Sequence, residues 1–193
     1  NSEKEKETVL HIGSQPGKLS SSQSGEIKLF LSKSEGNPFH LTYKSGSTGQ
    51  ENVQLQTNYA SLTTASVGDA NWHHYAFRMH TDDDEMFIKC YVDGELDNET
   101  ILSIGDTIGT VDSYMSGRLG ANLQDSAGSL SGSLDSFRFW KGLRTAKEIS
   151  KFYDKKIYAS NTKEKTYTSR LGVKYGFNKS NVLDDKINSL VPT

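Results

Sequence analysis

The stretch NWHHYAF, residues 71–77, places two adjacent histidines between a tryptophan and a tyrosine. Continued to residue 79, it alternates with a period of two, which predicts a β-strand. One face is apolar enough to pack on a core and consists of His73, Tyr75, Phe77 and Met79; the other consists of Trp72, His74, Ala76 and Arg78. Neighbouring strand residues point to opposite sides, so the pattern favours a structural role for the two histidines over a shared metal ion.

Similar short runs, β-rich or alternating, recur along the chain. They cover residues 26–31, 39–43, 53–57, 86–92 and 134–140, and clusters of Gly, Ser, Asn and Asp separate them. The acidic run TDDDE, residues 81–85, fits a solvated hairpin turn between two of these strands. Many short strands with such turns predict an all-β fold, a β-sandwich of the jelly-roll type.

One helix interrupts this pattern in RTAKEISKFYD, residues 144–154. Thr145 and Glu148 have the spacing of a capping box, in which each side chain bonds the backbone of the other residue. Ile149, Phe152 and Tyr153 follow at intervals that form one apolar stripe. We therefore expect a short helix near the C-terminal end that packs against the sandwich.

Composition restricts the classes of function. The chain has 193 residues and 34% hydrophobic residues, enough for one well-buried core, and its formal net charge of -2 gives no basic surface for nucleic acid. No apolar run approaches the roughly 18 residues of a membrane-spanning helix. The single cysteine, Cys90, lies in the alternating run MFIKCYV and fits a small buried side chain on a strand.

Three motifs in order resemble one family: NWHHYAF, then YVDGEL, then GSLDSFRFWKGLRTAKEISKFY. Together they are similar to the laminin G-like branch of the concanavalin A-like lectin/glucanase superfamily, over roughly residues 8–188. The resemblance implies one jelly-roll domain over residues 1–193, with residues 155–193 closing it or leading to a next repeat. VLHIGSQ resembles the point after the family's opening strands. Either something else replaces those strands, or the first part of the domain lies on another segment, in which case a neighbouring chain or segment would complete the sandwich.

Members of this family are mostly recognition modules that bind glycans or proteins, often with a calcium ion, and the glucanase relatives hydrolyse polysaccharides. The segment ELDNE, residues 95–99, resembles the acidic strand of those hydrolases, which need two carboxyl groups about 5 Å apart. Here the segment follows directly on the Asp93-Gly94 turn and contains Asn98, which argues against a catalytic strand, and the laminin G-like resemblance implies an exposed turn leaving a hairpin at this position. The sequence therefore predicts a non-catalytic domain, with hydrolysis as the third alternative.

Candidate ligand residues are aromatic, because sugars stack on exposed rings beside polar groups. They are Tyr59, Tyr114 and Trp140, of which Trp140 suits a core better than a ligand site because it ends a hydrophobic strand. Calcium prefers carboxylate oxygens in loops, and the candidates are Asp83, Asp125 and Asp135. Asp135 is chosen because it matches the family's recurrent Asp in GSLDSF, and it equally suits a carboxylate that ties a neighbouring loop through backbone N–H groups. Arg138 is expected to form a structural pair or to stack on an aromatic ring, in preference to a ligand site.

We therefore expect a recognition or adhesion module that binds carbohydrate, located outside the cell or on a cell or virion surface. The alternative is a structural interaction domain of a virion or extracellular multidomain protein, whose partner is protein. No nucleic acid or membrane insertion is expected. The sequons at Asn98 and Asn178 are compatible with secretion.

Overall fold

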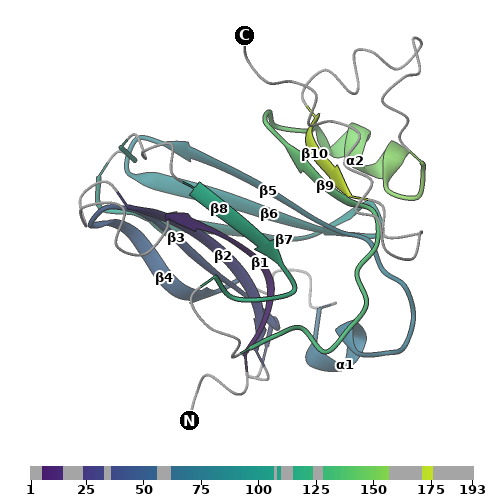
Figure 1. Ribbon diagram of the computed structural model, residues 1–193. Helices are drawn as coiled ribbons and strands as arrows, with labels where there is room; N and C mark the ends of the chain where they lie inside the picture. The colour runs from purple at the N-terminus through teal and green to yellow at the C-terminus, as the bar shows by residue number, and fades with distance from the viewer. Residues whose placement is uncertain are drawn as a thin grey trace, which may run out of the picture.

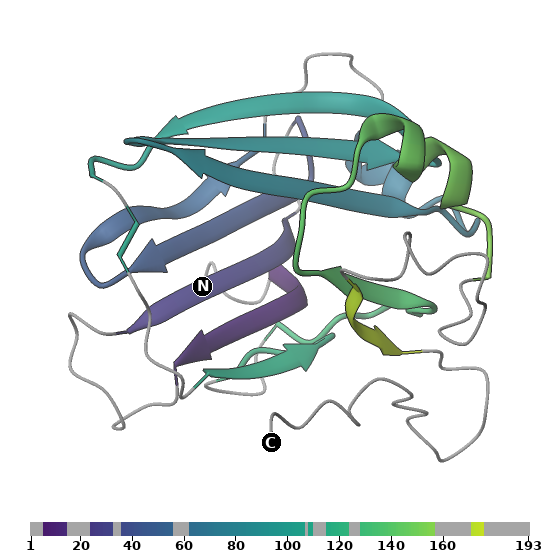
Figure 2. The ribbon, with the colours of Figure 1, turned by 90° about the horizontal axis from the view of Figure 1, so that it is seen from above.

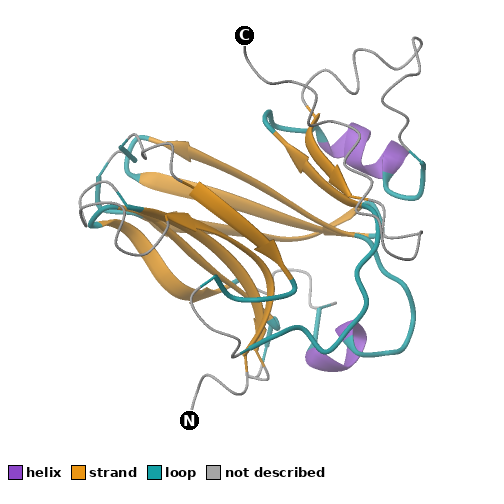
Figure 3. Cartoon of the chain, in the orientation of Figure 1, coloured by secondary structure: helices purple, strands orange, loops and turns teal. Residues whose placement is uncertain are grey.

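The computed structural model describes residues 6–14, 24–32, 36–55, 62–106, 108–109, 115–123, 128–156 and 171–175. Strands dominate these ranges, and the two helices are short (Figures 1 and 3). The strands are β1 (Lys6–Ser14), β2 (Gly25–Ser32), β3 (Phe39–Ser45), β4 (Thr48–Gln54), β5 (Tyr75–Asp82), β6 (Glu85–Val92), β7 (Glu95–Ser103), β8 (Met115–Leu119), β9 (Phe137–Trp140) and β10 (Leu171–Tyr175); the helices are α1 (Thr64–Val67) and α2 (Ala146–Phe152).

Antiparallel pairing joins these strands into three sheets. The order is β4-β3-β2-β1-β8 in the largest, β5-β6-β7 in the second and β10-β9 in the smallest. The five-stranded and three-stranded sheets lie over one another as two layers, and α2 lies at one end of the three-stranded sheet (Figure 2). This is the predicted all-β sandwich.

The core fills the space between the two larger sheets. Its buried residues are Leu29, Phe39, Leu41, Leu55, Leu62, Met86, Ile88, Cys90 and Ile104. Phe39 makes edge-to-face contacts with Tyr75 and Phe77, with ring centroids 5.1 and 4.9 Å apart. Burying a side chain of this size contributes about 1.5–3 kcal/mol. The apolar face predicted for residues 73–79 is therefore confirmed for Tyr75, Phe77 and Met79, which pack against this core.

Two tight turns organise the three-stranded sheet. The first, Asp83-Asp84, joins β5 to β6 with Asp82 opposite Glu85, which confirms the predicted hairpin in the acidic run. The second, Asp93-Gly94, joins β6 to β7 with both residues at positive φ, 48° and 87°. Gly94 has a second reason to lack a side chain, because a Cβ there would lie 2.7 Å from the Tyr153 ring.

The predicted helix is confirmed as α2. The Thr145 side chain accepts a hydrogen bond from the Glu148 N–H, and Glu148 bonds back to the Thr145 N–H at 2.8 Å. Arg138 on β9 donates to the backbone carbonyls of Phe152 at 3.0 Å and Lys155 at 2.6 Å. The expected structural role of Arg138 is thus to hold the C-terminal end of α2 against β9 by these two hydrogen bonds.

The structure corrects the expectation for ELDNE. These residues are not an exposed turn, because β7 begins at Glu95, immediately after the Asp93-Gly94 turn, and runs to Ser103. Strands β1 and β8 also add to the predicted set, and β4 begins at Thr48, before the predicted run 53–57. Their sequences do not alternate clearly between polar and apolar residues, and pairing with neighbouring strands helps to hold them, together with Val9 and Leu10 of β1, which pack against the core.

Within the described ranges, no helix has both the length and the apolar character needed to cross a membrane.

Candidate functional site

Several polar contacts gather just before β5, around the stretch NWHHYAF. His73 Nδ1 lies 2.7 Å from Asp93 Oδ2, and His73 Nε2 lies 3.1 Å from Asp69 Oδ2. One imidazole therefore bridges two carboxylates from different segments: Asp69 follows α1, and Asp93 belongs to the β6–β7 turn. We call Asp69, His73 and Asp93 the histidine bridge.

Local sequence explains how Asp69 comes to face His73. Helix α1 ends at the C-cap residue Gly68, and Ala70 then turns the chain with a positive φ of 67°. The Asp69 carboxylate accepts the Asn71 N–H at 2.9 Å and also receives the Asn71 side-chain amide at 3.0 Å. This Asx-type turn points the chain back towards β5.

Trp72 lies inside this braced segment, and its side chain faces solvent. It is 70% exposed, the highest value among the exposed large hydrophobic residues, which also include Ile101 at 49% and Leu143 at 41%. An indole held open to water gains nothing from burial on folding. Its two neighbours, Asn71 and His73, are fixed by hydrogen bonds, so the ring is presented from a constrained backbone.

His74 has the opposite environment from His73. Its ring packs 6.0 Å from that of Tyr153, and its backbone N–H donates to Asp93 Oδ1 at 2.8 Å. Burial lowers the pKa of His74, and the nearby positive charge of Arg138 lowers it further. This histidine is therefore a neutral packing element between β5 and α2.

The histidine bridge favours charge. The hydrogen bond that His73 donates to Asp93 raises the pKa of His73, and the hydrogen bond that it donates to Asp69 raises this pKa further. Hydrogen bonds from the Asn71 side chain and backbone lower the pKa of Asp69 to about 2, with a smaller contribution from His73. The pKa of Asp93 is also lowered, so both carboxylates are ionised across the mildly acidic range in which His73 is protonated.

With this geometry in place, comparison with known families gives one finding. Residues 18–150 match the laminin G model of the Concanavalin A-like lectin/glucanases superfamily, which is more than half of the chain. The chain belongs to the laminin G-like family. Comparisons with curated proteins and with solved structures gave no match. Laminin G-like domains are typically non-catalytic and commonly extracellular, although the superfamily includes glucanases.

In this laminin G-like domain, the acidic residues of ELDNE do not converge. A β-bulge at Asp97 changes the strand register, so that Leu96 faces Tyr91 and Asn98 faces Cys90. Glu99 pairs with Lys89 at 2.9 Å, and Glu95 lies opposite Val92, which packs on the core. Glu95 and Glu99 therefore lie on opposite faces of the sheet.

The bulge buries both Asp97 and Asn98, at 4% and 0% exposure. Asn98 Nδ2 donates to Asp97 Oδ2 at 2.9 Å. A glycan cannot be attached to a fully buried amide, so the sequon at Asn98 gives no support for secretion; that at Asn178 lies outside the described residues.

Among the residues predicted to bind ligand, Tyr59 and Tyr114 lie outside the described residues. Trp140 is half-buried at the end of β9, and the Arg144 guanidinium lies 4.5 Å from its ring centroid. One face of this ring is thus already used within the domain. A ligand role for these three residues stays a prediction. The sequence pattern did not indicate a ligand role for Trp72, because alternation alone assigned Trp72 to one face of the predicted strand.

Of the predicted calcium ligands, Asp83 is exposed at the β5–β6 turn, and Asp135 is exposed with Oδ1 accepting the Ser136 N–H at 2.7 Å. Asp125 lies outside the described residues. In the described part of the chain, no group of three or more His, Cys, Asp or Glu side chains is arranged to hold a metal ion. The described carboxylates therefore do not fit a calcium site by themselves, and calcium binding stays a prediction.

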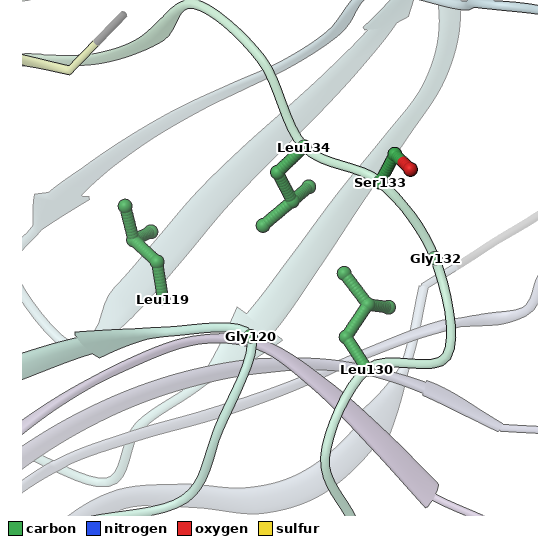
Figure 4. Close-up of a pocket in the computed structure, with 6 residues that line it drawn as sticks. All are labelled: Leu119, Gly120, Leu130, Gly132, Ser133 and Leu134. Atoms are coloured by element: carbon green, nitrogen blue, oxygen red, sulfur yellow. The ribbon is translucent and has the colours of Figure 1, made fainter. Parts of the chain in front are cut away.

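A hollow of about 310 Å³ lies between the end of β8 and the segment that precedes β9. Leu119, Leu130 and Leu134 point towards one another across it, beside Ser133 (Figure 4). Sugar sites need several polar groups next to an apolar surface. This lining offers one hydroxyl, so the hollow is less suited to a sugar than the surface around Trp72.

Proposed function

We propose that this laminin G-like domain is a non-catalytic recognition module that binds carbohydrate on a cell or particle surface, and that Trp72 is its contact residue. The observation that carries the proposal is the 70% exposed indole on a segment fixed by the histidine bridge. A rigid aromatic ring offers an apolar face to a sugar at little cost in conformational entropy. Polar groups for the sugar hydroxyls lie next to it in sequence, on Asp69 and Asn71.

The divergence of Glu95 and Glu99 supports a non-catalytic role, because retaining hydrolysis requires two carboxyl groups that face each other across the substrate bond. The family supports a location outside the cell. Calcium enters the proposal only as a condition to be tested.

The test is glycan-array binding of the intact chain, in calcium and in chelator, for the natural protein and for Trp72→Ala. We expect at least about a tenfold loss of array signal for the variant, equivalent to ~1.4 kcal/mol, because the stacking surface is removed. Ile101→Ala is the matched control: it also removes an exposed apolar side chain, but from β7. Its binding should equal that of the natural protein.

Equal binding by Trp72→Ala and the natural protein would contradict the role of Trp72. Absence of binding in every condition would contradict carbohydrate recognition. The favoured function would then be the structural interaction domain, whose partner is protein. For that case the described sheets offer one supporting observation: Leu96 and Ile101 are partly exposed along β7, at the edge of the three-stranded sheet.

A further inference from the structure

Both nitrogens of His73 face carboxylate oxygens, at 2.7 and 3.1 Å. An ionised carboxylate only accepts hydrogen bonds, and a neutral imidazole carries one N–H. Both contacts can be hydrogen bonds at once only if His73 is the imidazolium. The histidine bridge is therefore complete in one protonation state and incomplete in the other.

The groups that face His73 come from three places in the described structure. Asp69 comes from the segment after α1, Asp93 from the β6–β7 turn, and the Tyr75 ring lies 6.2 Å away on β5. Burial raises the pKa of Tyr75 to about 12, so this ring stays neutral. The two charges that act on His73 at close range are thus both negative.

We propose that the proton on His73 is a switch that orders the segment 69–72 and thereby sets how Trp72 is presented. The consequence for ligand binding rests on the function proposed above. The switch itself is a property of the chain without ligand. It predicts an ordered Trp72 at mildly acidic pH and a looser one at alkaline pH.

Asp93 and Asp69 differ in the hydrogen bonds that they keep when His73 loses its proton. Asp93 keeps the His74 N–H, which donates to Oδ1 at 2.8 Å, and it makes the shorter contact with His73. Asp69 makes the longer contact and lies on the exposed segment. The remaining N–H of neutral His73 therefore stays with Asp93, and the contact with Asp69 is lost.

The sign follows from the direction of the shift. The folded-state pKa of His73 is raised, so the bridge is complete below the usual histidine pKa of about 6.5 and is lost as pH rises through the raised value. The pKa of Asp69 is about 2, so Asp69 remains charged across the mildly acidic range. Burial lowers the pKa of His74, so His74 loses its proton at a lower pH than His73 does.

Nuclear magnetic resonance of the intact chain tests the switch without ligand. Imidazole ¹⁵N shifts report the protonation of His73, and backbone order parameters report the mobility of residues 69–72, both from about pH 5.5 to pH 9. We expect both His73 nitrogens to be protonated at the acidic end. The order parameters of residues 69–72 should fall from about 0.85 to below about 0.6 as His73 titrates.

Two variants distinguish the switch from a general effect of pH. Asp69→Asn should lower the His73 pKa and leave the segment mobile throughout, whereas the control Glu95→Gln removes an exposed carboxylate outside the bridge and should change neither. A neutral His73 at the acidic end, or constant order parameters through its titration, would overturn the proposal.

The glycan array at about pH 6 and pH 8.5 adds the functional readout. We expect several-fold weaker binding at the higher pH in the natural protein and weak binding at both pH values in Asp69→Asn. An ordered-to-mobile transition with no array signal at either pH would contradict the carbohydrate proposal and confirm the switch. Binding through Trp72 that is unchanged by a confirmed transition would contradict the coupling between them.

Discussion

Three consecutive residues, Trp72, His73 and His74, have three different environments. Trp72 is open to solvent, His73 bridges two carboxylates, and His74 packs against Tyr153. The strand begins only at Tyr75, so the two histidines precede it and do not continue its alternation. The prediction that residues 72–74 already belong to the strand was wrong, because the Asp69 and Asp93 carboxylates hold this segment in another conformation.

His11 is a second histidine that depends on distant residues. It lies on β1 at 1% exposure, with Nε2 2.9 Å from Glu26 Oε1 and Nδ1 2.8 Å from Asn122 Oδ1. The hydrogen bond from His11 lowers the pKa of Glu26. This contact therefore stabilises the fold most when Glu26 is ionised.

Glu26→Gln should lower the free energy of unfolding by about 1–2 kcal/mol near pH 6.5, because it weakens a charge-assisted hydrogen bond to a buried partner. The folded-state pKa of Glu26 is lowered, so the stabilisation is complete above about pH 4.3 and is lost as pH falls through the lowered value. Urea denaturation at several pH values measures the difference, which should shrink in acid. The control is Glu51→Gln, at an exposed pair with Lys44 on the same sheet, which should change stability by less than about 0.5 kcal/mol. A pH-independent difference would contradict this account.

At the scale of the elements, the Asp93-Gly94 turn does two things. It reverses the chain between β6 and β7. Its Gly94 also lies close against Tyr153 and Ser150, at the C-terminal end of α2. The same turn supplies Asp93 to the histidine bridge. The position of α2 and the bridge therefore depend on one two-residue turn.

Gly94→Ala should destabilise the domain by about 2–3 kcal/mol. The positive φ of 87° costs about 1 kcal/mol for alanine, and the added Cβ would lie 2.7 Å from Tyr153, which forces α2 to move. Gly105→Ala is the matched control, because Gly105 also has a positive φ, of 81°, but a Cβ there meets nothing within 4 Å. Its cost should be about 1 kcal/mol. Equal losses of stability in the two variants by thermal or urea denaturation would show that the contact with α2 contributes nothing.

At the scale of the whole molecule, a five-stranded sheet faces a three-stranded one in the described residues. The buried core draws on both, with Leu41 from the first and Ile88 from the second. Neither sheet can bury its apolar face without the other. The hypothesis that a neighbouring chain or segment adds strands to this sandwich stays a prediction.

We expect the two sheets to unfold in one transition. Leu41→Ala and Ile88→Ala should each lower the free energy of unfolding by about 2–4 kcal/mol, since each opens a cavity in the shared core. Circular dichroism and tryptophan fluorescence should give coincident curves. Separate transitions would contradict a common core. Sedimentation at several protein concentrations measures the oligomeric state. A monomer that unfolds in one cooperative transition would count against the hypothesis that a second chain completes the sandwich.

Short-range patterns of residues were enough to predict several elements of this protein. The alternation of Tyr75, Phe77 and Met79 was enough for a strand, the spacing of Thr145 and Glu148 for a capped helix, and the acidic run for a hairpin turn. Each depends on residues within a few positions of one another. The order of the motifs was enough for the laminin G-like family, which the match over residues 18–150 confirmed.

Only the tertiary structure decided which of these residues form a site. His73 meets Asp93 from 20 residues away, and that contact, rather than local alternation, fixes its conformation. The bulge at Asp97 likewise depends on pairing with β6, and it separates carboxylates that the sequence pattern placed together. The exposure of Trp72 depends on how distant segments of the chain pack around it. Local pattern specifies the strands, but contacts between distant segments determine which side chains remain available to a ligand.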